Sequence, residues 1–161
     1  MQSITLIVLG KLNASYFREA AAEYQKRLSA FCKLNIVELP EETIREKNVS
    51  QSTIQKTLEK EAQEILRHVV RPGVLVAMCI EGKQLSSEEL SVFLEQRAIS
   101  GEGSVTFVIG SSHGLADAVK KLADYRFSMS KMTFPHQLAR VMLLEQIYRA
   151  FCIQSGNKYH K

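Results

Sequence analysis

Residues 105–110 read Val-Thr-Phe-Val-Ile-Gly and continue into Ser111, Ser112, His113 and Gly114. A short run of β-branched, aromatic and aliphatic residues without charge is typical of a strand that is covered on both faces. Glycine allows close approach of a backbone to a ligand, and ligands of α/β proteins bind at the carboxyl ends of strands. On the pattern alone a tight strand-to-helix turn is the simpler explanation, because the loop lacks both the P-loop and the G-x-G-x-x-G spacing.

A second apolar run, 74–80, has the same character and is followed by a charged turn at residues 81–83. Ser86 and Glu89 then form a capping box, which predicts a helix that ends near Gly101. Further strands are expected at 3–9, 34–39 and 125–129, and further helices at 15–31, 52–69, 115–122 and 135–151. Residues 40–51 are expected to form an exposed loop. The alternation predicts one α/β domain with a mostly parallel sheet flanked by helices.

The length of 161 residues suits one domain, and 45% hydrophobic with 24% charged residues is ordinary for a soluble protein. No apolar run approaches the roughly 20 residues of a membrane span, and the amino terminus resembles a strand, not a signal peptide. Cys32, Cys79 and Cys152 are far apart without Cys-x-x-Cys spacing, so neither a disulfide framework nor a metal site is expected. We therefore expect a cytoplasmic protein whose cysteines are reduced.

Charge is distributed unevenly along the chain. The formal net charge is +4, but residues 120–161 contain eight Lys or Arg and two acids, whereas residues 1–119 contain thirteen basic and fifteen acidic side chains. This asymmetry favours an anionic partner at the carboxyl-terminal end, and nucleic acid is the obvious candidate. A basic end kept for solubility is the alternative.

The segment 127–136, Phe-Ser-Met-Ser-Lys-Met-Thr-Phe-Pro-His, is expected to be a loop before a helix that Pro135 starts. Its backbone could meet an adenine edge while Met and Phe side chains cover the ring. The alternative is a packed loop whose methionines fill gaps in the core.

The helix 135–151 is apolar in nearly all directions, which indicates burial on every side and therefore a partner subunit. Glu145 and Arg149 are spaced as an i, i+4 ion pair, either in a site or as a structural pair at a dimer interface. The end of the chain carries Tyr159 and His160 between lysines, which could stack on an unpaired base. Composition alone favours a frayed terminus there.

Two motifs, Met132-Thr133-Phe134-Pro135-His136-Gln137-Leu138 and Leu144-Glu145-Gln146-Ile147-Tyr148-Arg149-Ala150, together with the Tyr-His end, resemble the RlmH-type family of the SPOUT (α/β-knot) methyltransferases. The resemblance runs the whole chain, from the Val8-Leu9-Gly10-Lys11-Leu12 start onward. It implies methylation of N3 of a pseudouridine in 23S ribosomal RNA with S-adenosyl-L-methionine. It also implies a homodimer and one α/β-knot domain over 1–161, with a trefoil-knotted cofactor-binding part at roughly 74–161.

The resemblance also implies a cofactor pocket made of Met78, Gly110, Met129, Ser130, Lys131, Met132, Thr133 and Phe134. The chain departs from the family at three positions. It has Met78 where Leu is common, Cys79 where an acid is common, and Ser111 where a second glycine is common.

The catalytic candidates are four. By hypothesis Glu145 and Arg149 orient the base edge, and Tyr159 and His160, reaching over from the other protomer, cover and deprotonate the base. Glu145, His136 and His160 are the open choices for general base.

The basic residues expected to contact phosphates are Lys120, Lys121, Arg126, Lys131 and Arg140. A chain this small has little surface for sequence readout, so an assembled ribosome is the expected substrate, with no membrane partner. The alternatives are a SPOUT enzyme that acts on tRNA and a non-enzymatic ribosome-binding factor. A flavin or nucleotide-binding enzyme is disfavoured by the missing phosphate motif.

Overall fold

In the part of the chain that the structure describes, five strands alternate with five helices. The computed structural model describes residues 1–161 except 43 and 45–48, so the predicted loop 40–51 lies partly outside the described residues. The capping box at Ser86 is present, because its Oγ accepts from the Glu89 N–H and its own N–H donates to Glu89 Oε2. The elements are β1 (Ser3–Leu9), α1 (Ser15–Leu28), β2 (Lys33–Leu39), α2 (Gln51–Arg67), β3 (Val74–Gln84), α3 (Ser87–Ile99), β4 (Ser104–Ile109), α4 (Asp117–Leu122), β5 (Tyr125–Ser128) and α5 (His136–Gln154).

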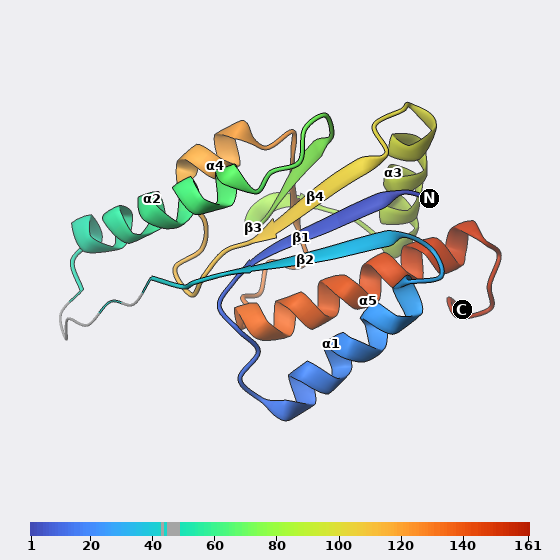
Figure 1. Cartoon of the computed structure of the whole chain (residues 1–161), viewed down its shortest axis with the longest axis horizontal. Coiled ribbons are helices and arrows are strands. Elements are labelled where there is room, and N and C mark those ends of the chain that lie inside the picture. The colour runs from blue at the N-terminus through green and yellow to red at the C-terminus, as the bar shows by residue number, and fades with distance from the viewer. Residues whose placement is uncertain (43, 45–48) are drawn as a thin grey trace.

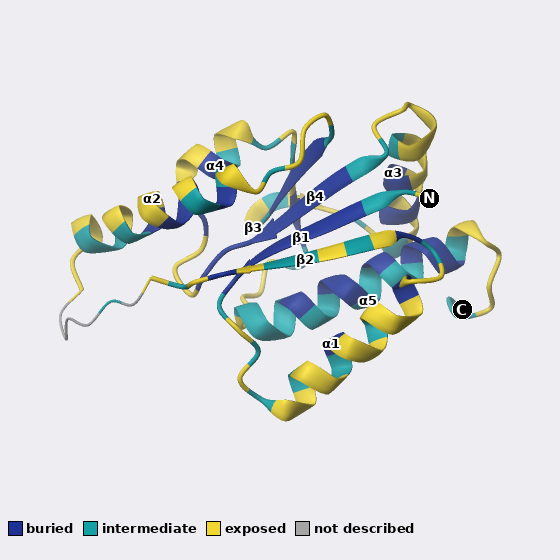
Figure 2. Cartoon of the chain, in the orientation of Figure 1, coloured by how far each residue is buried: buried dark blue, intermediate teal, exposed yellow. Residues whose placement is uncertain are grey.

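All strand pairs of the sheet are parallel, in the order β2-β1-β4-β3-β5. Helices α1, α3 and α5 cover one face, whereas α2 and α4 cover the other (Figure 1). The central strands β1 and β4 are therefore buried on both faces, while the residues of edge strand β2 are exposed or half-buried up to its last residue, Leu39, which is buried (Figure 2). This arrangement confirms the predicted α/β architecture.

Strand β3 is longer than the sequence predicts. Residues 81–83 were expected to form a charged turn, which is wrong, because β3 continues through them to Gln84. Met78 and Lys83 both pair with Phe127 of β5, so the strand bulges between them. A Cβ atom at Gly82 would lie 2.7 Å from the carbonyl carbon of Phe127, and only glycine allows two main chains to pass this closely.

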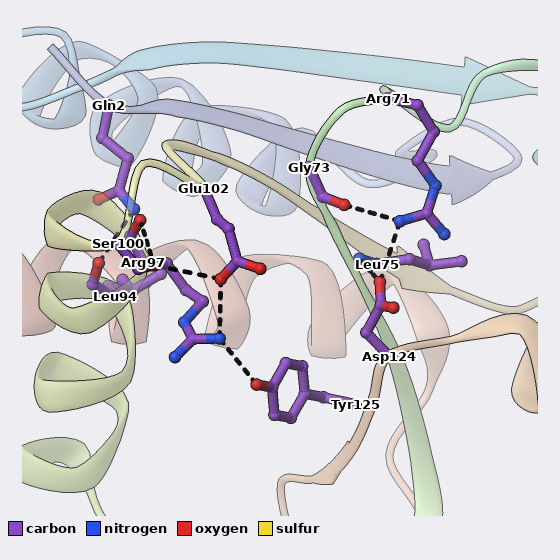
Figure 3. Close-up of polar contacts among 10 residues, drawn as sticks. All are labelled: Gln2, Arg71, Gly73, Leu75, Leu94, Arg97, Ser100, Glu102, Asp124 and Tyr125. Atoms are coloured by element: carbon purple, nitrogen blue, oxygen red, sulfur yellow. Dashed lines mark hydrogen bonds and ion pairs between the residues drawn. The ribbon is translucent and has the colours of Figure 1, made fainter.

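The short edge strand β5 is fixed to the sheet by side chains at its beginning (Figure 3). The Asp124 carboxylate accepts from the Leu75 N–H at 2.8 Å and from Arg71 at 3.1 Å. The Arg97 guanidinium donates to the Tyr125 hydroxyl at 2.8 Å. These contacts hold β5, and hence the loop that follows it, against β3.

Helix α5 lies between α1 and α3 on one face of the sheet (Figure 1). Pro135 is its N-cap residue, and the helix extends three residues beyond the predicted end. Helix α1 ends before its predicted end, yet Phe31 still stacks on Phe151 with ring centroids 6.0 Å apart. Within one chain the outer apolar residues of α5 stay half-buried; they include Leu138, Val141 and Met142. Among the described residues, no helix has the length and hydropathy needed to cross a membrane.

Candidate active site

Three predicted cofactor segments meet at the carboxyl edge of the sheet. Met78 of β3 is paired with Ile109 of β4 on one side and with Phe127 of β5 on the other. Gly110 follows Ile109 directly, and the loop 129–134 follows the end of β5 at Ser128. The fold therefore brings Met78, Gly110 and the start of this loop together, as parallel strands must when their carboxyl ends are in register.

The loop 129–134 has internal polar contacts and an open outer surface. Ser128 Oγ donates to the Ser130 carbonyl at 2.8 Å, and the Met132 N–H donates to Ser130 Oγ at 3.0 Å. The Met132 side chain is 73% exposed. In the described part of the chain, the N–H groups of Lys131 and Thr133 donate to no protein acceptor. Free main-chain donors beside an exposed thioether fit a ligand that has a polar edge and an apolar face.

The loop that begins at Gly110 is tightly closed. The Gly114 N–H donates to the Ser111 carbonyl at 2.9 Å, and a Cβ at Gly110 would lie 2.2 Å from the Gly114 carbonyl oxygen. Ser111 occupies the position where the family often has a second glycine. Its buried hydroxyl donates to Glu61 Oε1 at 2.8 Å. Glu41 accepts from both the N–H and the hydroxyl of Ser112.

Glu61 is a site residue that the sequence did not reveal. It lies on α2, is only 3% exposed and accepts from Ser111 and from the Glu42 N–H. Burial raises its pKa above 4.5 despite these hydrogen bonds. An acid in an amphipathic helix normally faces solvent, so no pattern in the sequence distinguishes Glu61 from its exposed neighbours.

The Glu61→Gln variant is expected to flatten the pH dependence of stability. A carboxyl whose folded-state pKa is raised contributes stability at low pH, and this contribution is lost as the pH rises through the folded-state pKa. Glutamine does not titrate, so the stability of the variant should not show this decrease as the pH rises. Urea unfolding of both proteins between about pH 4.5 and pH 8 measures the difference. If the free energies of unfolding of the two proteins changed with pH in parallel, the raised pKa would not belong to Glu61.

The predicted catalytic residues form one network on the second half of α5. Arg149 Nε donates to Glu145 Oε1 at 2.9 Å, and this contact raises the pKa of Arg149. The Tyr159 hydroxyl donates to the same oxygen at 3.1 Å, and Gln146 donates to Glu145 Oε2 at 2.8 Å. The Arg149 guanidinium also lies 4.8 Å from the centre of the Tyr159 ring.

His160 joins this network to the start of α3. Arg149 Nη1 lies 3.2 Å from His160 Nδ1, and His160 Nε2 lies 2.8 Å from Glu88 Oε1. Because arginine can only donate, Nδ1 accepts and Nε2 donates. This hydrogen bond with His160 lowers the pKa of Glu88. The carboxyl terminus is therefore docked on its own chain, whereas composition favoured fraying.

Tyr159 is placed to pack and to donate a hydrogen bond. Its ring lies 4.9 Å from that of Tyr148. Burial, a hydrogen bond with Tyr24 and the nearby Glu145 carboxylate raise its pKa to about 12. The phenol therefore keeps its proton at neutral pH.

Within one chain, the structure does not bring the catalytic network and the cofactor loop together. Glu145 lies nine residues after the first residue of α5, His136, which corresponds to about 14 Å along the helix axis. His136 itself lies beside the loop, with Nε2 3.8 Å from Glu41 Oε2.

The predicted phosphate contacts divide into three kinds. Lys121, Arg126 and Lys131 are exposed. Lys120 pairs with Glu81 at 2.6 Å. Arg140 is not a surface cation, because it is 2% exposed and its guanidinium donates to Glu38 and to the Gly10 carbonyl.

Of two cavities described in the structure, neither is lined by the predicted cofactor residues. One, of about 330 Å³, lies at the β3 bulge beside Gly82 and Arg126. The other, of about 370 Å³, lies between α1, β2 and the beginning of α5.

A model of one protein family, described as "Predicted SPOUT methyltransferase", matches residues 2–160. The chain belongs to the SPOUT methyltransferase family. Membership makes it a methyltransferase and implies a methyl donor. Two similar relatives are both named "Ribosomal RNA large subunit methyltransferase H". The protein from Clostridium acetobutylicum is 49% identical over 160 residues, 99% of each chain. That from Bifidobacterium adolescentis is 47% identical over 158 residues, 98% of this chain and 99% of the relative.

Solved structures share the fold of this SPOUT methyltransferase at low sequence identity. A methylase-family protein from Haemophilus influenzae superimposes with a TM-score of 0.52 at 13% identity, covering 98% of this chain and 70% of the other. One from Neisseria gonorrhoeae gives a TM-score of 0.54 at 15% identity, covering 90% and 81%. At these identities the likeness concerns the fold alone.

Proposed function

We propose that this SPOUT methyltransferase transfers a methyl group from S-adenosyl-L-methionine to N3 of a pseudouridine in 23S rRNA of the assembled ribosome. The observation that carries the proposal is the 49% identity, over 99% of both chains, with a protein named for methylation of large-subunit ribosomal RNA. The exposed cations Lys121, Arg126 and Lys131 support a nucleic-acid substrate.

The residues at the carboxyl edge of the sheet fit a nucleoside-type methyl donor. The N–H groups of Lys131 and Thr133, which donate to no acceptor among the described residues, suit the polar edge of an adenine, and the exposed Met132 suits its face. Met78, Gly110, Met129, Ser130 and Phe134 complete the proposed pocket. When bound, S-adenosyl-L-methionine supplies an electrophilic methyl on a sulfonium. The protein's task is then to align the acceptor nitrogen and to accept its proton.

Glu145 and Arg149 are proposed to orient the base edge, with Tyr159 covering the base. The pKa of about 12 supports a donating role for Tyr159 and argues against it as a proton acceptor. Glu145 and His160 are the acceptor candidates of the network, and His136 is the candidate beside the cofactor loop. A pH–rate profile for the alanine variant at each position distinguishes them. The rate of the wild-type enzyme should fall at low pH as the acceptor becomes protonated, and only substitution of the true acceptor removes this fall.

A homodimer is proposed because the loop and the catalytic network lie apart within one chain. Half-buried apolar residues on the outer side of α5, such as Val141 and Met142, would be covered by a second copy. The carboxyl terminus of one protomer would then complete the site of its partner. The chain from about residue 74 onward is proposed to form the trefoil knot within a single domain.

The decisive experiment is methyl transfer to ribosomes from cells that lack the protein, followed by mass spectrometry of the nucleosides. We expect N3-methylpseudouridine in 23S rRNA, and slower modification of protein-free RNA. Methylated tRNA would favour the alternative SPOUT substrate. Failure to bind S-adenosyl-L-methionine in calorimetry would instead favour a ribosome-binding factor without enzymatic activity.

RNA affinity is expected to fall steeply with salt. For three phosphate contacts, log K against log salt should have a slope of about −2 with single-stranded RNA. The pair of substitutions Lys121→Gln and Arg126→Gln should make this slope shallower by about 1.4, because both side chains are exposed. Filter binding between about 50 and 200 mM KCl measures it. An unchanged slope would remove these residues from the interface.

A further inference from the structure

The cavity of about 370 Å³ beside α1 has no role in the site described above. Three of its lining residues are cations: Lys11 after β1, Arg18 on α1 and Arg140 on α5. They come from separate elements of the fold and meet around one hollow, which distinguishes them from a scattered basic surface.

Arg140 is the unusual member of this set. It is 2% exposed; Nη1 donates to Glu38 Oε2 and Nη2 to the Gly10 carbonyl, each at 2.6 Å. Among the described residues its Nε has no hydrogen-bond partner, but this atom is buried beyond the reach of a bound molecule. Arg140 therefore contributes to the cavity through the positive charge of its guanidinium, which its two hydrogen bonds hold at the cavity wall.

The charge balance of the cavity favours an anion. Glu38 is its acidic lining residue, and that carboxylate is already bound to Arg140. Arg18 Nη1 donates to the carbonyls of Leu12 and Asn13. These acceptors are neutral, so they leave the charge of Arg18 uncompensated. Within the described residues, neither Lys11 nor Arg18 takes part in a salt bridge.

The remaining walls are suited to more than a bare anion. Leu12, Ala21 and Ile36 give an apolar side, and Gln25 adds an amide with both a donor and an acceptor. A volume of about 370 Å³ lies within the range of small-molecule sites. A phosphate bearing a sugar and a base fits this combination of a cationic rim and an apolar wall.

The location connects this cavity with the proposed function. Arg140 lies one helical turn after His136, which is separated from the proposed cofactor loop by Pro135 alone. Lys11 follows β1, the neighbour in the sheet of β4, whose end leads into Gly110. We infer that the cavity holds a nucleotide of the RNA strand that flanks the modified residue, with its phosphate among Lys11, Arg18 and Arg140. The RNA part of this inference rests on the proposed function.

The first test measures ligand binding without any methyl transfer. Methyl-resolved NMR titration of the full chain with uridine 5′-monophosphate should shift Leu12 and Ile36, and uridine alone should not. The double variant Lys11→Gln/Arg18→Gln should lose these shifts. Equal shifts with inorganic phosphate would overturn the nucleotide assignment, and no shift with the nucleotide would overturn the site.

The second test uses ribosomes as substrate. The Lys11→Gln/Arg18→Gln variant should raise KM by roughly tenfold, leaving kcat and S-adenosyl-L-methionine affinity unchanged. The matched control is Lys26→Gln/Lys33→Gln, which removes the same charge from exposed positions outside the cavity lining. A KM equal to that of the control would overturn the inference. If the wild-type chain does not methylate ribosomes, the proposed function fails, and the NMR result still decides whether the cavity binds a nucleotide.

Discussion

A chain that ends at Lys158 is expected to lose methyl transfer by at least about 10³-fold while it still binds S-adenosyl-L-methionine. The deletion removes the Tyr159 hydroxyl from Glu145 and removes His160 from between Arg149 and Glu88. Glu145 then keeps Arg149 but loses a fixed orientation, and the base loses its cover. The proposed cofactor residues are untouched, so calorimetry should give a dissociation constant within a few-fold of the wild-type value.

Single substitutions separate the parts of this effect. Tyr159→Phe keeps the ring beside Arg149 and Tyr148 but removes the hydrogen bond to Glu145, so a partial loss is expected. Deletion of Lys161 alone serves as the control, because this exposed residue lies outside the network. Single-turnover methyl transfer to ribosomes is the measurement. Full turnover by the chain ending at Lys158 would exclude the terminus from catalysis.

Gly110→Ala is expected to weaken S-adenosyl-L-methionine binding by about 100-fold or more, equivalent to roughly 2.7 kcal/mol. A Cβ atom there would lie 2.2 Å from the oxygen and 2.4 Å from the carbon of the Gly114 carbonyl. Both are main-chain atoms, which cannot rotate away as the end of a side chain can. The loop must open, and it takes with it Ser111 and its hydrogen bond to Glu61.

Gly103→Ala is the matched control for this substitution. Gly103 also lies outside the left-handed region, and a Cβ there meets no atom within 4 Å. Calorimetry with S-adenosyl-L-methionine measures affinity, and circular dichroism verifies that both variants are folded. Wild-type affinity in a folded Gly110→Ala protein would remove this loop from the cofactor site.

The two variants together test whether the site is shared between protomers. Neither the chain ending at Lys158 nor Gly110→Ala should be active alone. In a mixed dimer, one site would combine an intact loop with an intact partner terminus, so random pairing should restore about a quarter of wild-type activity. No recovery on mixing would mean that each terminus serves its own chain.

The sequence predicted the elements whose signals are local. The uncharged run 105–109 is a buried strand, the run 74–80 is a strand that is buried as far as residue 77, and Ser86 caps a helix as expected. The strand-end rule for parallel sheets pointed to the loop at Gly110. Met78 and the rest of the proposed site were supplied by the resemblance.

Features that depend on distant partners were not predictable. The β3 continuation through Gly82 exists because β5, more than 40 residues later, pairs with it. Glu61 is buried because Ser111 and the Glu42 N–H satisfy it, and nothing near Glu61 in the sequence records either partner. The docked terminus likewise depends on Arg149 and Glu88, which lie on two different helices.

The network around Arg149 also has a consequence for proteolysis. Tyr159 and His160 are bound to Glu145, Arg149 and Glu88, so the main chain around them is docked on two helices. A protease cuts a segment that can leave the protein surface and enter its cleft. Cleavage by trypsin after Lys158 should therefore be slow in the folded protein and should become faster when Arg149 is replaced.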